Sequence, residues 1–280
     1  MDSGRRVWNV FVELTTKSIT HANGLIVGLK YKLGLSEDAA GVDPDLLCAY
    51  RHLKKWYYRF ATWLLVGRKF DAKIDPFEVH YLDPDSITTA ITDITVHEWS
   101  TTEGMISEVI SGDWDKQTVR FRDGDIYRAI SDRYENDKEW EETKFFRRIR
   151  TEIESGKTKW GCETVDEFEQ RCEVIDELVE FIDEYGYLTQ DQLCRVLREP
   201  NQVDSLPAPP SLSEILVSVS RDGEYVFVDG RHRLAIAKTL DIEKVPVQVK
   251  ARHEKWQQKR ERIINDEEIK SKSHPDLLGL

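Results

Sequence analysis

The most regular alternation of apolar and polar residues lies in residues 211–253. Its first part has a period of two, which is typical of a strand with one buried face. Asp222-Gly223 then predicts a tight hairpin turn and residues 225–228 a returning strand. Residues 231–240 have helical spacing, and residues 245–249 predict a last strand, in which Pro246 suits an edge strand or the first position of a strand. The shared-face positions are Ile215, Val217 and Val219 in the first strand, and Leu234, Ala237 and Leu240 in the helix.

Helical and strand-like spacings also organise the chain before and after this segment. Phe77, Val79 and Tyr81 alternate as an early strand, and residues 88–99 are rich enough in Thr and Ile to form another. We expect helices over residues 125–134 and 137–154. A further helix is opened by the capping box Thr164–Glu167 and ended by Gly186. After residue 253 the pattern predicts a charged helix to about residue 269 and a frayed tail.

Residues 1–70 are predicted to be mainly helical. Residues 7–16 fit a short strand or a helix, and the clearer helix begins at Asp43-Pro44 and ends near Gly67. Its apolar stripe is Leu46, Leu47, Tyr50, Leu53, Tyr57, Phe60 and Leu64. Aromatic residues (Trp56, Tyr57, Tyr58, Trp63) lie among basic ones (Arg51, Lys54, Lys55, Arg59) in this helix. Such a mixture can stack on bases, but the clean period favours a core stripe with a solvated basic face.

Composition limits the class of protein. The 280 residues are 40% hydrophobic and 10% aromatic, enough to build a core. The net charge of −12 argues against broad, non-specific binding of nucleic acid. The four cysteines form no C-x-x-C pair, so we expect a reduced chain in the cytoplasm. No apolar run approaches the ~20 residues of a spanning helix, so no membrane partner is expected.

The start of the predicted helix at residue 231 is unusual in its charge. A helix N-terminus carries partial positive charge, yet this one opens with Arg231, His232 and Arg233. Free N–H groups, bidentate arginine donors and a glycine at position 230 together make a cradle for a phosphate. The alternative is a solvated basic turn that is capped by Asp229.

This turn resembles the signature of the ParB/sulfiredoxin superfamily, in which a Gly-x-x-Arg turn after a strand holds nucleotide phosphates. Here the turn is DGRHR, residues 229–233, so Gly230 and Arg233 match the superfamily and His232 matches its sulfiredoxin form. Arg231 stands where sulfiredoxins have their catalytic cysteine and where ParB proteins have Glu. The resemblance therefore does not extend to sulfinic acid reduction, and it leaves CTP hydrolysis in question. It covers about 40 residues around the turn, a moderately specific signal.

The resemblance implies an α/β (α+β) fold with a mixed sheet and helices. We predict an N-terminal helical region over residues 1–70 and a ParB/sulfiredoxin-like core over residues 71–253. A helical insertion is expected at about residues 97–160, and a charged C-terminal helix and tail over residues 254–280. The last segment is too short for the helix-turn-helix region of ParB proteins, so a stand-alone nucleotide-binding domain is expected.

The first functional hypothesis is a nucleotide-dependent enzyme that transfers a phosphoryl group to a small molecule or hydrolyses a nucleoside triphosphate. Residues 230–233 hold the phosphates of ATP, ADP or CTP, with Mg²⁺. Asp229 is the best-placed carboxylate for proton transfer, and His232 donates a hydrogen bond. No protein metal-ligand cluster is predicted. Weaker site candidates are Glu98, Asp113, Asp115, Arg252 and His253.

Two other hypotheses remain at this stage. One is a ParB-like module that binds DNA or resembles a nuclease, supported by the aromatic and basic helix at residues 50–63. The other is a non-enzymatic module that binds a phosphorylated ligand or protein at the same turn. The sequence does not decide between a monomer and a homodimer.

Overall fold

The computed structural model describes residues 44–92, 107–196, 214–265 and 274–278. The expectations for residues 7–16 and for Glu98 therefore lie outside the described residues. The helices are α2 (Pro44–Leu65), α4 (Asp125–Tyr134), α5 (Lys144–Glu154), α6 (Val165–Tyr185), α7 (Gln190–Val196), α8 (Arg231–Thr239) and α9 (Glu254–Asn265). The strands are β1 (Val79–Leu82), β2 (Thr89–Ile91), β3 (Glu108–Ile110), β4 (Thr118–Arg120), β5 (Ile215–Val219), β6 (Tyr225–Asp229) and β7 (Val245–His253).

The strands form one seven-stranded mixed sheet in the order β1-β7-β5-β6-β2-β4, with β3 also pairing with β7. β5 and β6 are the predicted antiparallel hairpin, and β5 runs parallel to β7. β7 lies between β1 and β5, and all nine of its residues are buried. Pro246 therefore takes neither of its expected positions, an edge strand or the first residue of a strand. Pro246 is the second residue of an interior strand, where it lies opposite Tyr81 of β1.

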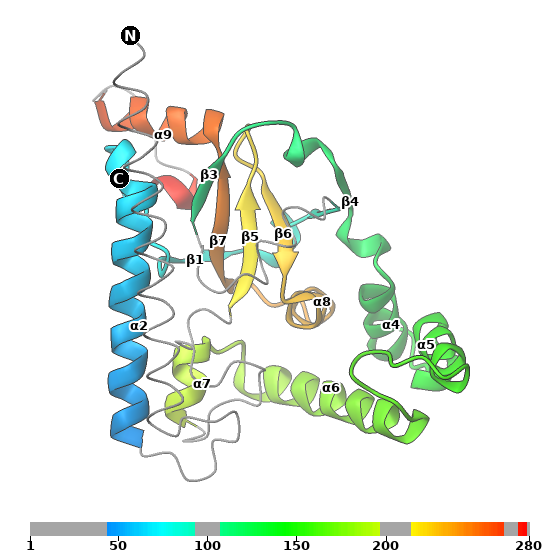
Figure 1. Ribbon diagram of the computed structural model, residues 1–280. Helices are drawn as coiled ribbons and strands as arrows, with labels where there is room; N and C mark the ends of the chain where they lie inside the picture. The colour runs from blue at the N-terminus through cyan, green and yellow to red at the C-terminus, as the bar shows by residue number, and fades with distance from the viewer. Residues whose placement is uncertain (1–43, 93–106, 197–213, 266–273, 279–280) are drawn as a thin grey trace.

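The main core lies between the sheet and the helices α4, α5, α6 and α8 (Figure 1). Ile215, Val217 and Val219 all belong to it, which confirms their predicted common face. The opposite face of the hairpin packs a smaller cluster that includes Leu216 and Trp114. Both faces of β5 and β6 are therefore covered, and the fold is a mixed α/β arrangement.

Local hydrogen bonds explain where the helices begin and end. Thr164 and Glu167 form the predicted capping box of α6, and Gly186 ends that helix with a φ of 76°. The helix expected from residue 137 begins later, because the Thr143 hydroxyl accepts a hydrogen bond from the backbone N–H of Phe146 and caps α5. A short 3₁₀ turn, Trp140–Glu142, precedes that cap.

The described part of the predicted insertion, residues 107–160, is joined to the rest of the molecule through both sheet and core. β3 pairs with β7, and β4 pairs with β2. α4 packs against α8, the helix that follows the basic turn. This segment is therefore not purely helical, and the structure does not set it apart from the sheet.

α2 lies along one side of the sheet (Figure 1). The residues of α2 that are buried differ from those that the sequence predicts. Tyr57, Tyr58 and Ala61 are buried and cluster with Phe77, but Leu53 and Phe60 of the predicted core stripe are exposed. The expected solvated basic face is also wrong in part. Lys54 is only 5% exposed, and the other basic residues of the described helix have partners.

The C-terminal residues 274–278 are packed rather than frayed. A 3₁₀ turn, Pro275–Leu277, buries Asp276 among three long side chains. The Asp276 carboxylate accepts hydrogen bonds from Arg252 at 2.5–3.1 Å and from the indole of Trp256 at 2.8 Å. Arg260 lies 3.4 Å from the same carboxylate. This buried network ties the C-terminal turn to β7 and α9.

Candidate functional site

The basic turn is built on a glycine that no other residue can replace without strain. Gly230 has φ 90° and ψ 33°, in the left-handed region. A Cβ atom there would lie 3.2 Å from the Cα atom of Ile215 and 3.3 Å from its side chain. The turn is therefore pressed against the start of β5, and α8 begins directly after it.

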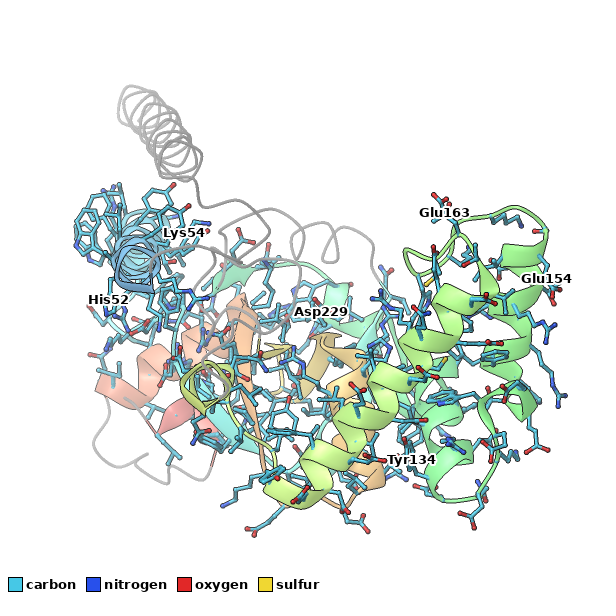
Figure 2. The ribbon with its side chains drawn as sticks, turned by 90° about the horizontal axis from the view of Figure 1, so that it is seen from below. His52, Lys54, Tyr134, Glu154, Glu163 and Asp229 are labelled. Atoms are coloured by element: carbon cyan, nitrogen blue, oxygen red, sulfur yellow. The ribbon has the colours of Figure 1, made fainter. Side chains whose placement is uncertain are left out.

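The N-terminus of α8 has no side-chain cap. Gly230 occupies the capping position, while the Asp229 carboxylate accepts a hydrogen bond from the N–H of Gly230 at 2.8 Å. The alternative in which Asp229 caps the helix is therefore wrong. Asp229 ends β6 as an exposed residue (Figure 2). The first N–H groups of a helix have no partner within the helix, so they remain available to an anion.

The three basic side chains of the turn have different surroundings. Arg231 is exposed. His232 packs edge-on against the Trp160 ring, with 4.8 Å between the ring centroids. Arg233 is half-buried and folds back toward Gly230, since its Nη2 atom lies 3.4 Å from the position that a Cβ atom would take. The three side chains therefore differ in exposure and in the groups that they contact.

His232 is a neutral donor rather than a cation. Burial lowers the pKa of its imidazole to about 4, and the charges of Arg231 and Arg171 add to this effect. Its Nε2 atom is buried and has no hydrogen-bond partner among the described residues. A neutral imidazole keeps one N–H, so His232 retains the capacity to donate a hydrogen bond but adds no charge at pH 7.

Arg233 lies beside a buried carboxylate, Glu214, and a half-buried tyrosine, Tyr187, neither of which the sequence predicted as a site residue. Glu214, only 2% exposed, accepts a hydrogen bond from the backbone N–H of Gln190 at 2.7 Å through one carboxylate oxygen. Its other oxygen, the Tyr187 hydroxyl and Nη1 of Arg233 are buried without a hydrogen-bond partner of normal geometry in the described parts of the chain, although the Arg233 guanidinium lies close enough to Tyr187 to oppose the rise in its pKa. Buried polar atoms normally have partners, so this group of three residues is suited to a polar ligand.

Burial also changes the protonation of this group. It raises the pKa of Glu214 to about 7, against the opposing effects of the Gln190 N–H and the Arg233 charge. Burial likewise raises the pKa of Tyr187 to about 12. Neither residue follows a motif: Glu214 only precedes an apolar strand, and Tyr187 only follows the glycine that ends α6.

The weaker candidates Asp113, Asp115 and His253 lie together, but at the opposite end of the hairpin. The guanidinium of Arg221 donates to Asp115 at 2.6 and 2.8 Å and to Asp113 at 2.6 Å. His253 contacts the carbonyl oxygen of Gly112 at 2.9 Å. Although burial acts the other way, hydrogen bonds from Arg221 lower the pKa of Asp115 to about 2. These groups already have partners.

Strand register separates the two ends. Ile215, next to Gly230, pairs with Val247, whereas Val219 pairs with Arg252 at the other end of β5. Val219 also pairs with Tyr225 of β6, which lies five residues before Gly230. Five residues of a strand span about 17 Å, so the two ends are about that far apart. Arg252 is completely buried against Asp276, so it serves the C-terminal network and does not reach the basic turn.

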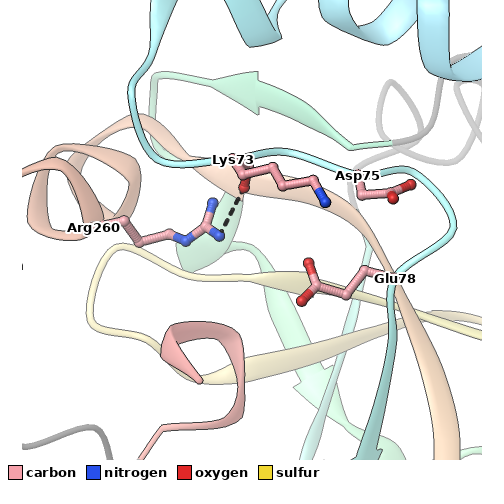
Figure 3. Close-up of a pocket in the computed structure, with 4 residues that line it drawn as sticks. All are labelled: Lys73, Asp75, Glu78 and Arg260. Atoms are coloured by element: carbon pink, nitrogen blue, oxygen red, sulfur yellow. Dashed lines mark hydrogen bonds between the residues drawn. The ribbon is translucent and has the colours of Figure 1, made fainter. Parts of the chain in front are cut away.

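Neither a pocket elsewhere nor a ligand cluster points to a metal site. An open pocket of ≈ 240 Å³ is lined by Lys73, Asp75, Glu78 and Arg260 (Figure 3). It contains none of the predicted site residues, and Arg260 there donates to the Lys73 carbonyl oxygen at 3.0 Å. In the ranges that the structure describes, no three His, Cys, Asp or Glu residues are grouped so that they could hold a metal ion.

Among the described helices, none combines the length and the apolar character that a membrane span requires.

Comparison of the chain with protein-family models, with curated proteins and with solved structures finds no match. The likeness to the ParB/sulfiredoxin superfamily therefore rests on the residues of the turn and its flanking strand and helix.

Proposed function

We propose that the Gly230–Arg233 turn binds the phosphates of a nucleotide, and that the protein is a ParB/sulfiredoxin-like enzyme of phosphoryl transfer or nucleotide hydrolysis. One observation carries the proposal. α8 begins at an uncapped glycine, and next to it a buried guanidinium nitrogen of Arg233 has no partner in the described chain. A helix N-terminus with open N–H groups and an arginine beside it favours a phosphate.

The residues of the turn take different parts in this proposal. The first N–H groups of α8 and Arg233 contact the phosphate nearest the turn. Arg231, which is exposed, contacts a phosphate farther out. His232 contributes at most one neutral hydrogen bond, because burial keeps it unprotonated at pH 7. Positive charge then comes from the two arginines and the helix dipole.

Glu214 is a better candidate than Asp229 for the proton transfer. A general base works best when its pKa lies near the operating pH, and the pKa of Glu214 is raised to about 7. Asp229 is exposed, and one of its oxygens already accepts from Gly230. Asp229 remains the carboxylate nearest the turn that can contact Mg²⁺ on a bound nucleotide.

A thermal-shift series tests the proposal. The native chain is titrated with ATP, ADP, CTP and GTP, with and without Mg²⁺, beside Arg233→Ala. A ligand at about a hundred times its dissociation constant adds about 2.7 kcal/mol of stability. Loss of one charge-assisted hydrogen bond costs about 1.5–3 kcal/mol, so Arg233→Ala weakens binding about ten- to a hundred-fold.

Arg150→Ala is the matched control, because Arg150 is an exposed arginine in a surface pair with Glu154 on α5. Equal nucleotide affinity of the native chain and of Arg233→Ala contradicts the proposed phosphate site. Binding without turnover supports the non-enzymatic hypothesis, in which the turn holds a phosphorylated partner. The DNA-associated hypothesis loses support from α2, because Lys55 and Arg59 are engaged with Asp191 and Asp75.

A further inference from the structure

α2 carries an exposed apolar stripe that the proposed nucleotide site does not explain. Leu53, Trp56, Phe60 and Trp63 are spaced by three, four and three residues, which places them on one face of the helix. They are 38%, 63%, 43% and 54% exposed, respectively. Trp56 stacks on Phe60 with 5.6 Å between centroids, and Phe60 contacts Trp63 at 6.0 Å. Contiguous exposed apolar surface of this kind marks an interaction site.

A different side of α2 holds the helix to the rest of the molecule. Tyr57, Tyr58 and Ala61 pack with Phe77 of the chain that leads into β1. Figure 2 looks along α2 and shows Lys54 on the side that faces the rest of the molecule, where its ammonium group lies over two tyrosine rings. The stripe is therefore not needed to attach the helix, and its exposure calls for another explanation.

The charges near the stripe argue for an apolar occupant. Lys55 pairs with Asp191 at 3.4 Å, and Arg59 pairs with Asp75 at 3.3 Å. Proteins that stack bases on aromatic side chains also provide free cations for the phosphates. Here the stripe itself has no charged residue, and these neighbouring cations are paired elsewhere, so a hydrophobic polypeptide segment fits it better than a nucleic acid.

We propose that the stripe is covered by the N-terminal segment of the same chain, residues 1–43. This segment ends at Asp43, directly before the first residue of α2. Its apolar residues gather at Leu25, Ile26, Val27, Leu29, Tyr31, Leu33 and Leu35. A short tether gives an effective concentration on the order of 1 mM, which exceeds that of a second copy of the protein at micromolar concentration.

Limited trypsin digestion of the full chain tests this proposal, because Lys30 and Lys32 lie within the apolar run. Packing on the stripe protects these two bonds, and proteolysis then depends on transient opening. Phe60→Glu places a charge in the stripe at an already exposed position. We expect cleavage after Lys30 and Lys32 to be about tenfold faster in this variant. Val174→Glu is the matched control, since Val174 on α6 is 54% exposed and lies outside the stripe.

A second variant changes the N-terminal segment instead of the stripe. Leu29→Ser removes an apolar group from the N-terminal segment, and we expect it to speed the same cleavage. Combined with Phe60→Glu, it adds little further acceleration, because both changes break one contact. Circular dichroism and thermal melting verify that each variant is folded.

Three results would overturn the proposal. One is equal cleavage of the native chain and Phe60→Glu. Another is a native dimer, seen by light scattering, that Phe60→Glu converts to a monomer, because the occupant is then a second copy. The last is binding of a labelled single-stranded oligonucleotide that Phe60→Glu abolishes and Val174→Glu does not.

Discussion

The two ends of the β5–β6 hairpin differ in how their polar groups are satisfied. At the end with the hairpin turn, Arg221 is held by Asp113 and Asp115. At the other end, buried atoms of Glu214 and Arg233 have no partner in the described chain. Both ends were plausible sites from residue types alone. A charge that is already paired in the fold has less to offer a ligand, so the incomplete end is the better candidate.

The C-terminal network differs from the basic turn in that its buried carboxylate is fully surrounded by donors, although Nη1 of Arg252 is also buried without a partner among the described residues. There, Asp276 is completely buried, but Arg252, Trp256 and Arg260 surround it with donors. These contacts, led by the charge of Arg252, hold the pKa of Asp276 well below its usual range despite burial. The network is therefore built for stability, and the comparison predicts where substitutions lower the free energy of unfolding and where they change ligand binding.

The largest effect is expected for Asp276→Ala. The change leaves the buried guanidinium of Arg252 without its carboxylate, and breaking a buried pair in this way costs about 3–5 kcal/mol. Urea unfolding measures this loss. Asp183→Ala, an exposed position on α6, is the control. A loss below that of ordinary surface substitutions would show that the network does not stabilise the fold.

Glu214→Gln is expected to change the pH dependence of stability. The folded-state pKa of Glu214, about 7, lies above its ordinary value of 4.5. Between these values the unfolded chain loses the proton more readily than the folded chain, so stability falls as pH rises from about 4.5 to about 7. The loss is about 3 kcal/mol. The amide side chain of the Glu214→Gln variant does not titrate. The free energy of unfolding of this variant therefore lacks the decrease between about pH 4.5 and about pH 7 that Glu214 causes in the native chain.

Urea unfolding between pH 4.5 and 8 measures the free energy of unfolding of the native chain and of the Glu214→Gln variant. His232 acts in the opposite direction over an overlapping range, because its pKa is lowered from 6.5 to about 4. The unfolded chain then binds a proton more readily, so stability is lost as pH falls below about 6.5. The informative quantity is therefore the difference between Glu214→Gln and the native chain, which cancels the His232 contribution. A difference that is independent of pH would contradict the raised pKa.

The smallest effect on stability is expected for Gly230→Ala, compared with Gly156→Ala. Both glycines have left-handed φ values, 90° and 85°, so each substitution carries a similar backbone strain of about 1 kcal/mol. Only at Gly230 does the new Cβ atom meet a neighbour, at 3.2 Å, whereas nothing lies within 4 Å at Gly156. Thermal unfolding should show a further loss of about 1 kcal/mol at position 230. Nucleotide binding should be lost only there, and equal effects at both positions would contradict the close approach.

The order of elements around the basic turn was predictable because it depends on local chemistry. The period-two pattern from Ile215 and the Asp222-Gly223 turn predicted a hairpin, and the structure has it. Thr164 and Glu167 likewise predicted the start of α6 through a capping box. These features depend on residues a few positions apart, so the sequence contains most of the information that determines them.

The α2 stripe shows where such reasoning ends. Helical period identified the helix, but not which of its apolar residues face the sheet, because apolar residues occur on more than one side. Phe60 was expected in the core and is exposed, while Tyr58 is buried. Only the position of the helix beside Phe77 decides this.

By itself, the sequence determined the glycine turn, its arginines and the strand and helix that flank it, because these are consequences of spacing and backbone preference. The tertiary structure decided which charges remain without partners. It brought Glu214 and Tyr187 to Arg233, buried Arg252 against Asp276, and joined Asp115 to Arg221. Those pairings connect residues far apart in the chain, and burial then sets their protonation. No local pattern contains that information, because desolvation depends on the whole fold.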